Sequence, residues 1–180
     1  MGPMSTLMTL SGSLRADSSN GRLLRHAATL LPAAVAVDHF EALASLPAFD
    51  PGLDHEPGPA VLDFRRRLKA ADAVLISTPE YAHGVPGSLK NALDWVVGSG
   101  ELVDKPVGVI VASASDGVFA MKALVEVLRT MSAKVPDELT LSVAGIRSKL
   151  GLDGVMDEGL GMELERLIGQ LVESSAEQNQ

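Results

Sequence analysis

The 180-residue chain contains no cysteine, and this absence removes several classes of function at once. Without thiols there can be no disulfide, no cysteine-ligated zinc or iron–sulfur site and no thiol redox couple. Any redox chemistry must therefore be carried by a bound organic cofactor.

Basic residues, aromatic residues and long apolar runs are also scarce. The 15 Lys and Arg residues are outnumbered by 23 Asp and Glu residues, and the formal net charge of -8 argues against nucleic acid as a partner. No apolar run reaches the roughly 18 residues of a membrane-spanning helix, and residues 1–6 carry no basic segment typical of a secretory signal. We therefore expect a cytoplasmic protein with no membrane partner.

Potential metal ligands are few as well. The run Asp54-His55-Glu56 lies in a loop rich in Pro and Gly, where such side chains are usually solvated, so no metal site is expected. The run Arg65-Arg66-Arg67 is interpreted as the solvated side of a helix, and His39 as a surface or boundary residue without a partner.

Short apolar runs alternate with segments of helical periodicity along the whole chain. The expected strands are residues 7–10, 34–39, 73–78, 107–113 and 139–142. The expected helices are residues 20–31, 59–69, 87–97 and 120–131, followed by a last amphipathic helix that carries Leu160, Leu164, Leu167, Ile168, Leu171 and Val172. Near-continuous apolar strands between helices predict an α/β fold, with a parallel sheet covered by helices on both faces. One domain over residues 1–180 is expected, with residues 1–5 and 174–180 frayed.

The first expected strand leads into a loop suited to an anion. This loop, Ser11-Gly12-Ser13-Leu14-Arg15, is followed by Ser18, Ser19 and Asn20 at the start of a helix. Small residues let backbone N–H groups approach a ligand, a helix start adds unpaired donors and a positive dipole end, and Arg15 adds a permanent charge. The loop matches neither the Walker pattern nor the Gly-x-Gly-x-x-Gly pattern. It predicts binding of a terminal phosphate monoester, and the alternative is an ordinary capped turn.

A second loop follows the strand at residues 73–78. It contains Pro79-Glu80-Tyr81 and a further proline at Pro86, so it is conformationally restricted. It also places the only tyrosine of an aromatic-poor chain at the mouth of a strand. A flat conjugated ligand would suit that position.

These two segments resemble those of the NADPH-dependent FMN reductases. The loop from Ser11 to Arg15 with Ser18 and Asn20 is similar to that family's phosphate loop, and Pro79-Glu80-Tyr81 with residues 86–95 is similar to its second flavin loop and following helix. The resemblance covers about residues 7–142. It implies a single-domain flavodoxin-like fold with a five-stranded sheet in the order 2-1-3-4-5. It also implies bound FMN, NADPH or NADH as donor, and a flavin, quinone, azo or similar small molecule as electron acceptor.

The resemblance further implies a set of cofactor-binding residues. The phosphate end would be held by Ser11, Ser13, Arg15, Ser18 and Asn20. The ring would lie along Pro79, Glu80, Tyr81, Ala82, His83 and Gly84. A third loop would contribute Ser113, Ser115 and Gly117, although it holds fewer glycines than the family's usual pattern, and Asp116 within it would oppose negative charge on the ring. No catalytic side chain is expected, because the flavin carries the chemistry.

The family resemblance also implies a homodimer or tetramer. In the helix expected at residues 87–97, Trp95 lies outside the apolar stripe and is predicted to be an interface anchor. Two other functions stay open: a one-electron carrier of the flavodoxin type, and a noncatalytic FMN-binding protein.

Overall fold

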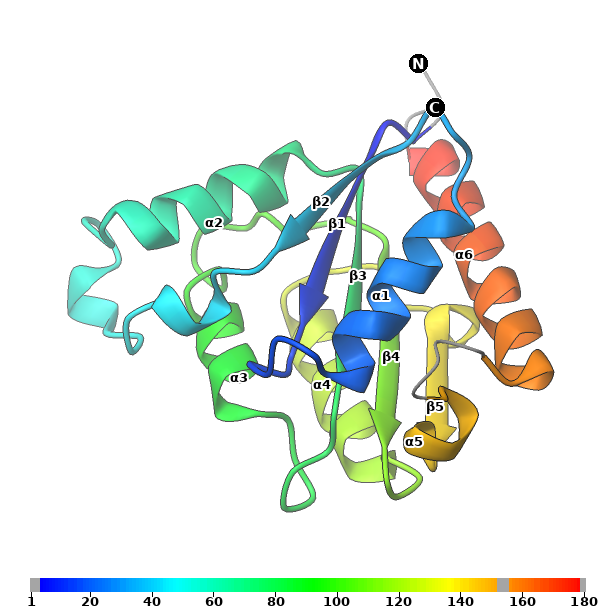
Figure 1. The fold of residues 1–180 in the computed structure, drawn as a ribbon. Coiled ribbons are helices and arrows are strands. Elements are labelled where there is room, and N and C mark those ends of the chain that lie inside the picture. The colour runs from blue at the N-terminus through cyan, green and yellow to red at the C-terminus, as the bar shows by residue number, and fades with distance from the viewer. Residues whose placement is uncertain (1–3, 152–155, 179–180) are drawn as a thin grey trace.

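A computed structural model describes residues 4–151 and 156–178, and its centre is a sheet of five parallel strands in the order β2-β1-β3-β4-β5 (Figure 1). The strands are β1 (Thr6–Ser11), β2 (Ala36–Phe40), β3 (Ala73–Thr78), β4 (Val107–Ser113) and β5 (Thr140–Ala144). The predicted fold class, strand order and parallel pairing are confirmed.

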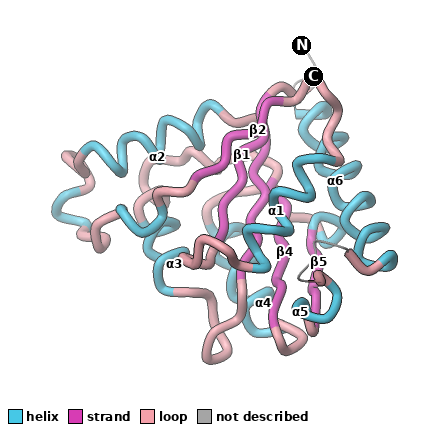
Figure 2. Tube along the Cα trace, viewed as in Figure 1, coloured by secondary structure: helices cyan, strands magenta, loops and turns pink. Residues whose placement is uncertain are grey.

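Helices cover both faces of this sheet (Figures 1 and 2). One face carries α1 (Ser19–Thr29) and α6 (Glu158–Gln178), and the other carries α2 (Pro59–Ala70), α3 (Gly87–Asp94) and α4 (Val118–Thr130). The short α5 (Ile146–Lys149) directly follows β5. Three 3-10 turns add η1 (Leu43–Ser45), η2 (Pro51–Leu53) and η3 (Asp137–Leu139).

The burial of each strand follows from its position in the sheet. Every residue of β3 and β4 is buried, as expected for apolar runs covered on both faces. In β1, Met8 and Leu10 join the core under α2, α3 and α4, whereas Leu7 joins the core under α1 and α6. The edge strand β2 is largely exposed or half-buried, and only Phe40 at its end is buried.

Residues near both ends of the described chain make specific contacts. Met4 is buried, and Ser5 donates to the Asp72 carboxylate from both its backbone N–H and its hydroxyl, each at 2.8 Å. Burial raises the pKa of Asp72, but the bonds from Ser5 and Thr6 outweigh it, so the net pKa is lowered. At the other end α6 continues to Gln178 and buries Ser175. The fraying expected for residues 1–5 and 174–180 stays a prediction, and residues 1–3 and 179–180 lie outside the described residues.

Trp95 does not fulfil its predicted role as an exposed anchor. Helix α3 ends at Asp94, and the Trp95 ring turns into the core with 0% exposure. Its Nε1 donates to the Pro47 carbonyl at 2.8 Å, and its ring meets Phe49 edge-on at 5.0 Å. A side chain enclosed by its own chain cannot be the anchor of an interface.

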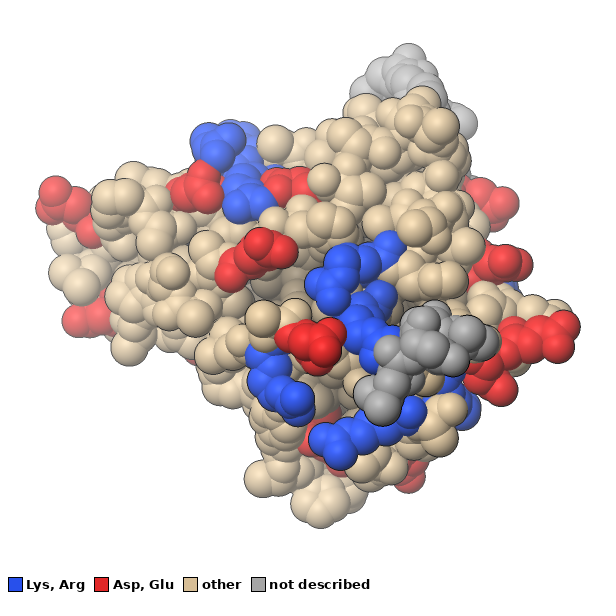
Figure 3. Space-filling view, in the orientation of Figure 1, with Lys and Arg blue, Asp and Glu red and all other residues tan. Residues whose placement is uncertain are grey.

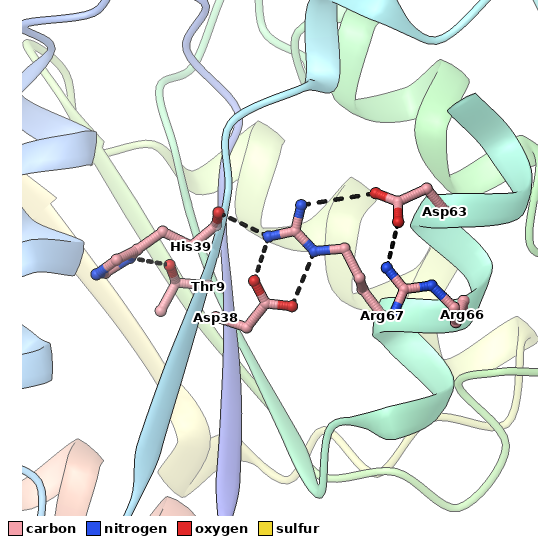
Figure 4. A network of polar contacts seen from close by, with 6 residues as sticks. All are labelled: Thr9, Asp38, His39, Asp63, Arg66 and Arg67. Carbon is pink, nitrogen blue, oxygen red and sulfur yellow. Dashed lines mark hydrogen bonds and ion pairs between the residues drawn. The ribbon is translucent and has the colours of Figure 1, made fainter. Parts of the chain in front are cut away.

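The arginines of α2 are also less solvated than predicted. Arg65, with a side chain only 13% exposed, donates to the Trp95 carbonyl and to Asp54. Arg67 donates to both carboxylate oxygens of Asp38 on β2 and to the backbone carbonyl of His39 (Figure 4). The hydrogen bond from Arg67 lowers the pKa of Asp38. Only Arg66 is mainly exposed, in a surface pair with Asp63.

Candidate functional site

Two cavities lie at the edge of the sheet where the parallel strands have their carboxyl ends. The larger one is surrounded by the ends of four strands. This main cavity has a volume of about 520 Å³ and is lined by parts of segments 13–20, 79–81, 112–114 and 145–148. These segments follow β1, β3, β4 and β5, which a parallel sheet brings to one edge. The position agrees with the general rule that open α/β sheets bind ligands beyond their carboxyl ends.

Gly12 sets the path of the loop between β1 and α1. A Cβ atom at this position would lie 2.7 Å from the Thr78 Cβ, closer than side chains pack. The Gly12 N–H donates to the Ser77 carbonyl at 2.8 Å. The loop is thereby held directly over the end of β3, and only glycine leaves room for this approach.

The start of α1 presents unused donors to the main cavity. Ser18 caps the helix by accepting from the Gly21 N–H at 3.0 Å. Within residues 4–151 and 156–178, the N–H groups of Ser19 and Asn20 donate to no other group of the chain. Together with the positive end of α1 and the exposed guanidinium of Arg15, these donors make a candidate anion site.

The Asn20 side chain has a supporting task. Its Nδ2 donates to the Ala112 carbonyl at 3.2 Å, and its Oδ1 accepts from the Ser77 hydroxyl at 2.8 Å. The buried amide thus ties the first turn of α1 to β3 and β4. A phosphate contact from this residue would come from its backbone N–H.

The loop after β3 contains a tight turn with unusual backbone geometry. Tyr81 and Gly84 exchange backbone hydrogen bonds of 3.0 and 2.9 Å across Ala82 and His83. Both central residues have positive φ, 49° and 58°, which is strained for residues other than glycine. The centroids of the His83 and Phe119 rings lie 4.3 Å apart in an edge-on arrangement, so the turn packs against α4. Tyr81 lines the main cavity and is 54% exposed.

Glu80 connects the second loop to the third. Its carboxylate accepts from the Ala120 N–H at 2.8 Å and from the Ser115 hydroxyl at 3.2 Å. It therefore occupies the N-terminus of α4, whose positive dipole end it neutralises. Asp116 lies at the same helix end, accepting from the Val118 N–H at 3.4 Å, and its side chain is exposed.

The glycine that ends the third loop is required by its geometry. Gly117 has φ of 70°, and a Cβ atom here would overlap the Val111 side chain. Ser113 is buried, and its hydroxyl lies 3.2 Å from that of Ser115. The loop is thus shaped by β4 and by Glu80 rather than by a run of glycines.

The structure brings together most, but not all, of the residues expected to hold a cofactor. Those that line the main cavity are Ser13, Arg15, Ser18, Asn20, Pro79, Glu80, Tyr81 and Ser113. Ser11 instead lines the smaller of the two cavities, which has a volume of about 350 Å³. The others lie in the same loops but outside the lining: Ala82, His83, Gly84, Ser115 and Gly117.

Sequence reasoning missed the segment after β5. Gly145, with φ of 63°, starts α5 and, with Ile146, Arg147 and Ser148, closes the main cavity on the side away from β2. Arg147 adds a second cation beside Arg15 at this cavity. Figure 3 shows Lys and Arg side chains gathering over α1 and α5, so this face is locally basic although the chain is acidic. The position of the segment at the carboxyl end of a parallel strand was the available signal.

Two further findings concern metals and membranes. No cluster of three or more His, Asp or Glu side chains in the described ranges is placed to hold a metal ion. None of the helices described here has both the length and the apolar character needed to cross a bilayer.

Comparison with known proteins places this architecture among flavin-dependent reductases. Residues 5–147 match the family model of the NADPH-dependent FMN reductases. The chain is 33% identical over 176 residues to a quinone reductase of Escherichia coli (strain K12), covering 92% of this chain and 90% of that protein. It is 36% identical over 112 residues to an NAD(P)H-dependent FMN reductase of Pseudomonas aeruginosa, covering 60% of each. Among solved structures, FerB, a flavoenzyme NAD(P)H:(acceptor) oxidoreductase of Paracoccus denitrificans, superposes with a TM-score of 0.80 at 26% identity and covers 96% of this chain and 98% of its own.

Proposed function

The chain belongs to the NADPH-dependent FMN reductase family, and on this premise we propose that it passes electrons from NAD(P)H to quinone-type acceptors at the main cavity. Its class is that of an FMN-dependent NAD(P)H oxidoreductase. The observation that carries the proposal is the polarity of the main cavity. One end gathers free N–H donors and Arg15, and the other end has its helix start neutralised by Glu80.

The residues that line the main cavity fit FMN in charge and polarity. A terminal phosphate matches the Ser13 and Ser18 hydroxyls, the Arg15 guanidinium and the first turn of α1. A flat neutral ring matches the Pro79 and Tyr81 side of the cavity, where the loops hold each other through Glu80. The buried Asn20 amide fixes the distance between these two ends, because it bonds both β3 and β4.

The protein's own contribution is binding, orientation and electrostatics. The chemistry that bound FMN supplies is transfer of two electrons from a nicotinamide to an acceptor. The α1 donors anchor the phosphate, while the strained turn at Ala82 and His83 holds Tyr81 at the rim. Since Tyr81 is half-exposed, the rim stays open for a nicotinamide and an acceptor to enter in turn.

The acceptor class rests on the relatives. The E. coli relative is named a quinone reductase, and a Burkholderia relative, 40% identical over 84 residues, is named a 2-hydroxy-1,4-benzoquinone reductase. A planar quinone would lie flat against the flavin at the rim beside Tyr81. A cytoplasmic location stays a prediction, supported by the need for a nicotinamide donor, and fractionation of the producing cells tests it.

We also propose that the protein works as a homodimer, which can pair further into a tetramer. With Trp95 buried, the support comes from two adjacent apolar side chains at the start of α4: Val118 and Phe119 are each 54% exposed. Large apolar side chains exposed next to each other are the kind of surface that a second subunit can cover. Light scattering tests it: Phe119→Glu should give monomers, whereas Met162→Glu, at a 66% exposed site on α6, should not. A wild-type monomer at micromolar concentration would overturn this assembly.

Anaerobic reduction of the FMN-loaded protein tests the activity directly. NADPH or NADH should bleach the flavin absorbance. A quinone added afterwards should restore the absorbance. Bleaching without recovery would reject quinones as acceptors. No bleaching with either nicotinamide would reject the reductase and favour an electron carrier or a noncatalytic FMN-binding protein.

A further inference from the structure

The cations that line the main cavity come from two separate segments. Arg15 lies in the loop between β1 and α1, whereas Arg147 lies in α5, beyond the end of β5. Neither takes part in an ion pair within residues 4–151 and 156–178. The proposed function gives Arg15 to the phosphate of FMN, and it leaves Arg147 without a task.

The sequence of α5 holds Arg147 at the cavity. Ile146 and Leu150 lie about one helical turn apart, and both are buried in the core under α1 and α6, with exposures of 5% and 4%. Arg147 lies between these two anchors, and its own side chain is exposed. Arg22 of α1 donates to the Gly151 carbonyl, which ties the end of the segment to α1. The backbone that carries Arg147 is therefore anchored on both sides.

A single phosphate group at α1 does not need both cations. There it would meet the free N–H groups of Ser19 and Asn20, the positive end of α1 and the guanidinium of Arg15. These groups can satisfy one phosphate by themselves. Arg147 is thus available for a second anionic group in the same cavity.

The charges around Arg147 favour such a group. Glu80 is the one acidic residue among the described residues that line the main cavity. Its carboxylate is engaged at the start of α4, where it accepts from the Ala120 N–H at 2.8 Å and from the Ser115 hydroxyl at 3.2 Å. The segment 145–148 adds no carboxylate of its own to the lining. An anion at Arg147 would therefore meet a cation without a competing acid from the same segment.

The smaller cavity is less suited to a second anion, because its charges are mixed. Arg25 of α1 and Glu41, the residue after β2, both line it, and Glu41 would repel an anion held by Arg25. His39 lines the same cavity, and its Nδ1 lies 2.6 Å from the Thr9 hydroxyl (Figure 4). His39 therefore has a partner, which corrects its interpretation as an unpartnered surface residue.

The two nicotinamide donors differ in one anionic group, the 2′-phosphate that NADPH carries and NADH lacks. We propose that Arg147 binds this 2′-phosphate and thereby selects NADPH over NADH, an inference that rests on the proposed function for placing FMN and the donor at the main cavity. Arginine suits the task, because its guanidinium is always charged and can donate two parallel hydrogen bonds to a phosphate. The donor would extend from the rim at Tyr81 across the end of β4, which lies between β3 and β5.

Calorimetric titration of NADP⁺ and NAD⁺ into the FMN-loaded protein tests the inference without turnover. NADP⁺ should bind about tenfold more tightly than NAD⁺. Arg147→Gln should remove this difference and leave the NAD⁺ affinity unchanged, whereas Arg147→Lys should keep part of it. Two matched losses of charge should keep all of it: Arg25→Gln at the smaller cavity and Arg166→Gln on α6.

Steady-state kinetics give a second readout that a merely structural role would not produce. Arg147→Gln should raise KM for NADPH about tenfold with kcat unchanged, and KM for NADH should stay the same. The FMN affinity of this variant should equal that of the wild type, because the phosphate of FMN is assigned to Arg15 and α1.

Four results would overturn the inference: no binding of NADP⁺ at millimolar concentration, equal wild-type affinities for NADP⁺ and NAD⁺, weaker FMN binding in Arg147→Gln, or loss of the preference in Arg25→Gln instead. Equal KM values for NADPH and NADH would overturn it as well, while the reductase activity would stand. If neither nicotinamide bleaches the flavin, the proposed function fails, and the NADP⁺ titration still decides whether Arg147 binds the 2′-phosphate.

Discussion

The helices α1 and α4 both begin at the main cavity, but their first turns are satisfied differently. At α1 the N–H groups of Ser19 and Asn20 have no partner in the described part of the chain, and Arg15 lies beside them. At α4 the first turn already has a partner from the chain itself, because the Glu80 carboxylate accepts from the Ala120 N–H.

This difference supports a proposal for how the two ends of a ligand are placed. A free helix start with an arginine favours negative charge, whereas a helix start already holding a carboxylate repels it. We therefore propose that the phosphate of FMN lies at α1 and its neutral ring at α4. Four substitutions test whether the two helix starts really have these separate tasks.

Gly12→Ala should disrupt the α1 side most strongly. The new Cβ would lie 2.7 Å from the Thr78 Cβ, so the loop must move away from β3. We expect a loss of about 2–3 kcal/mol in unfolding free energy, together with weakened FMN binding, measured by urea denaturation and fluorescence quenching. Gly161→Ala in α6 is the control, because nothing lies within 4 Å and the change should be neutral or slightly stabilising. Equal urea midpoints for Gly12→Ala and the wild type would contradict this account of the loop.

Arg15→Ala removes the charge but leaves the loop in place. FMN binding should weaken by about 1–3 kcal/mol, the range for a charge-assisted contact. Riboflavin, which lacks the phosphate, should bind the variant and the wild type equally. Titration of apo-protein with both flavins measures this, and equal wild-type affinity for FMN and riboflavin would refute the phosphate assignment.

Glu80→Gln opens the start of α4. We expect a loss of about 1 kcal/mol in unfolding free energy, a modest value because the carboxylate is half-exposed. FMN affinity should change less than in Arg15→Ala, since the phosphate end is untouched. Glu163→Gln on α6 provides the matched control in the same denaturation series. A larger loss of FMN affinity than in Arg15→Ala would show that the two helix starts do not divide the ligand as described.

Tyr81→Ala should have the smallest effect on affinity, below about 0.5 kcal/mol, because the phosphate anchors FMN elsewhere. Its effect should appear in the flavin absorbance spectrum and in turnover, since Tyr81 lines the ring end of the main cavity. An unchanged spectrum and unchanged kinetics would mean that Tyr81 points away from the ring.

Local patterns in the sequence predicted much of this architecture. The strands read as apolar runs because β3 and β4 are buried on both faces. The candidate phosphate loop could be proposed because its small residues, Arg15 and the cap Ser18 lie within eight positions of one another. Both features depend only on residues that are close together in the chain. A single sequence carries this kind of local information.

Contacts between distant segments could not be predicted in this way. Glu80 reaches the start of a helix 40 positions further on, and nothing near it in the sequence marks that partner. Trp95 departs from the helical stripe because α3 has already ended, and its burial depends on Pro47 and Phe49 in another segment. The contribution of residues 145–148 becomes visible only when the sheet order places β5 beside β4.

The central position of β1 has a consequence for the order in which the protein acquires its shape. This strand is synthesised first, yet it pairs with β2 on one side and with β3 on the other, and the loop after it is pinned to Ser77. Parallel pairings between distant segments form slowly, because a long connection must close first. A nascent chain therefore carries the phosphate loop unsupported until β3 has left the ribosome, and the anion site should form late in folding although its residues are translated early.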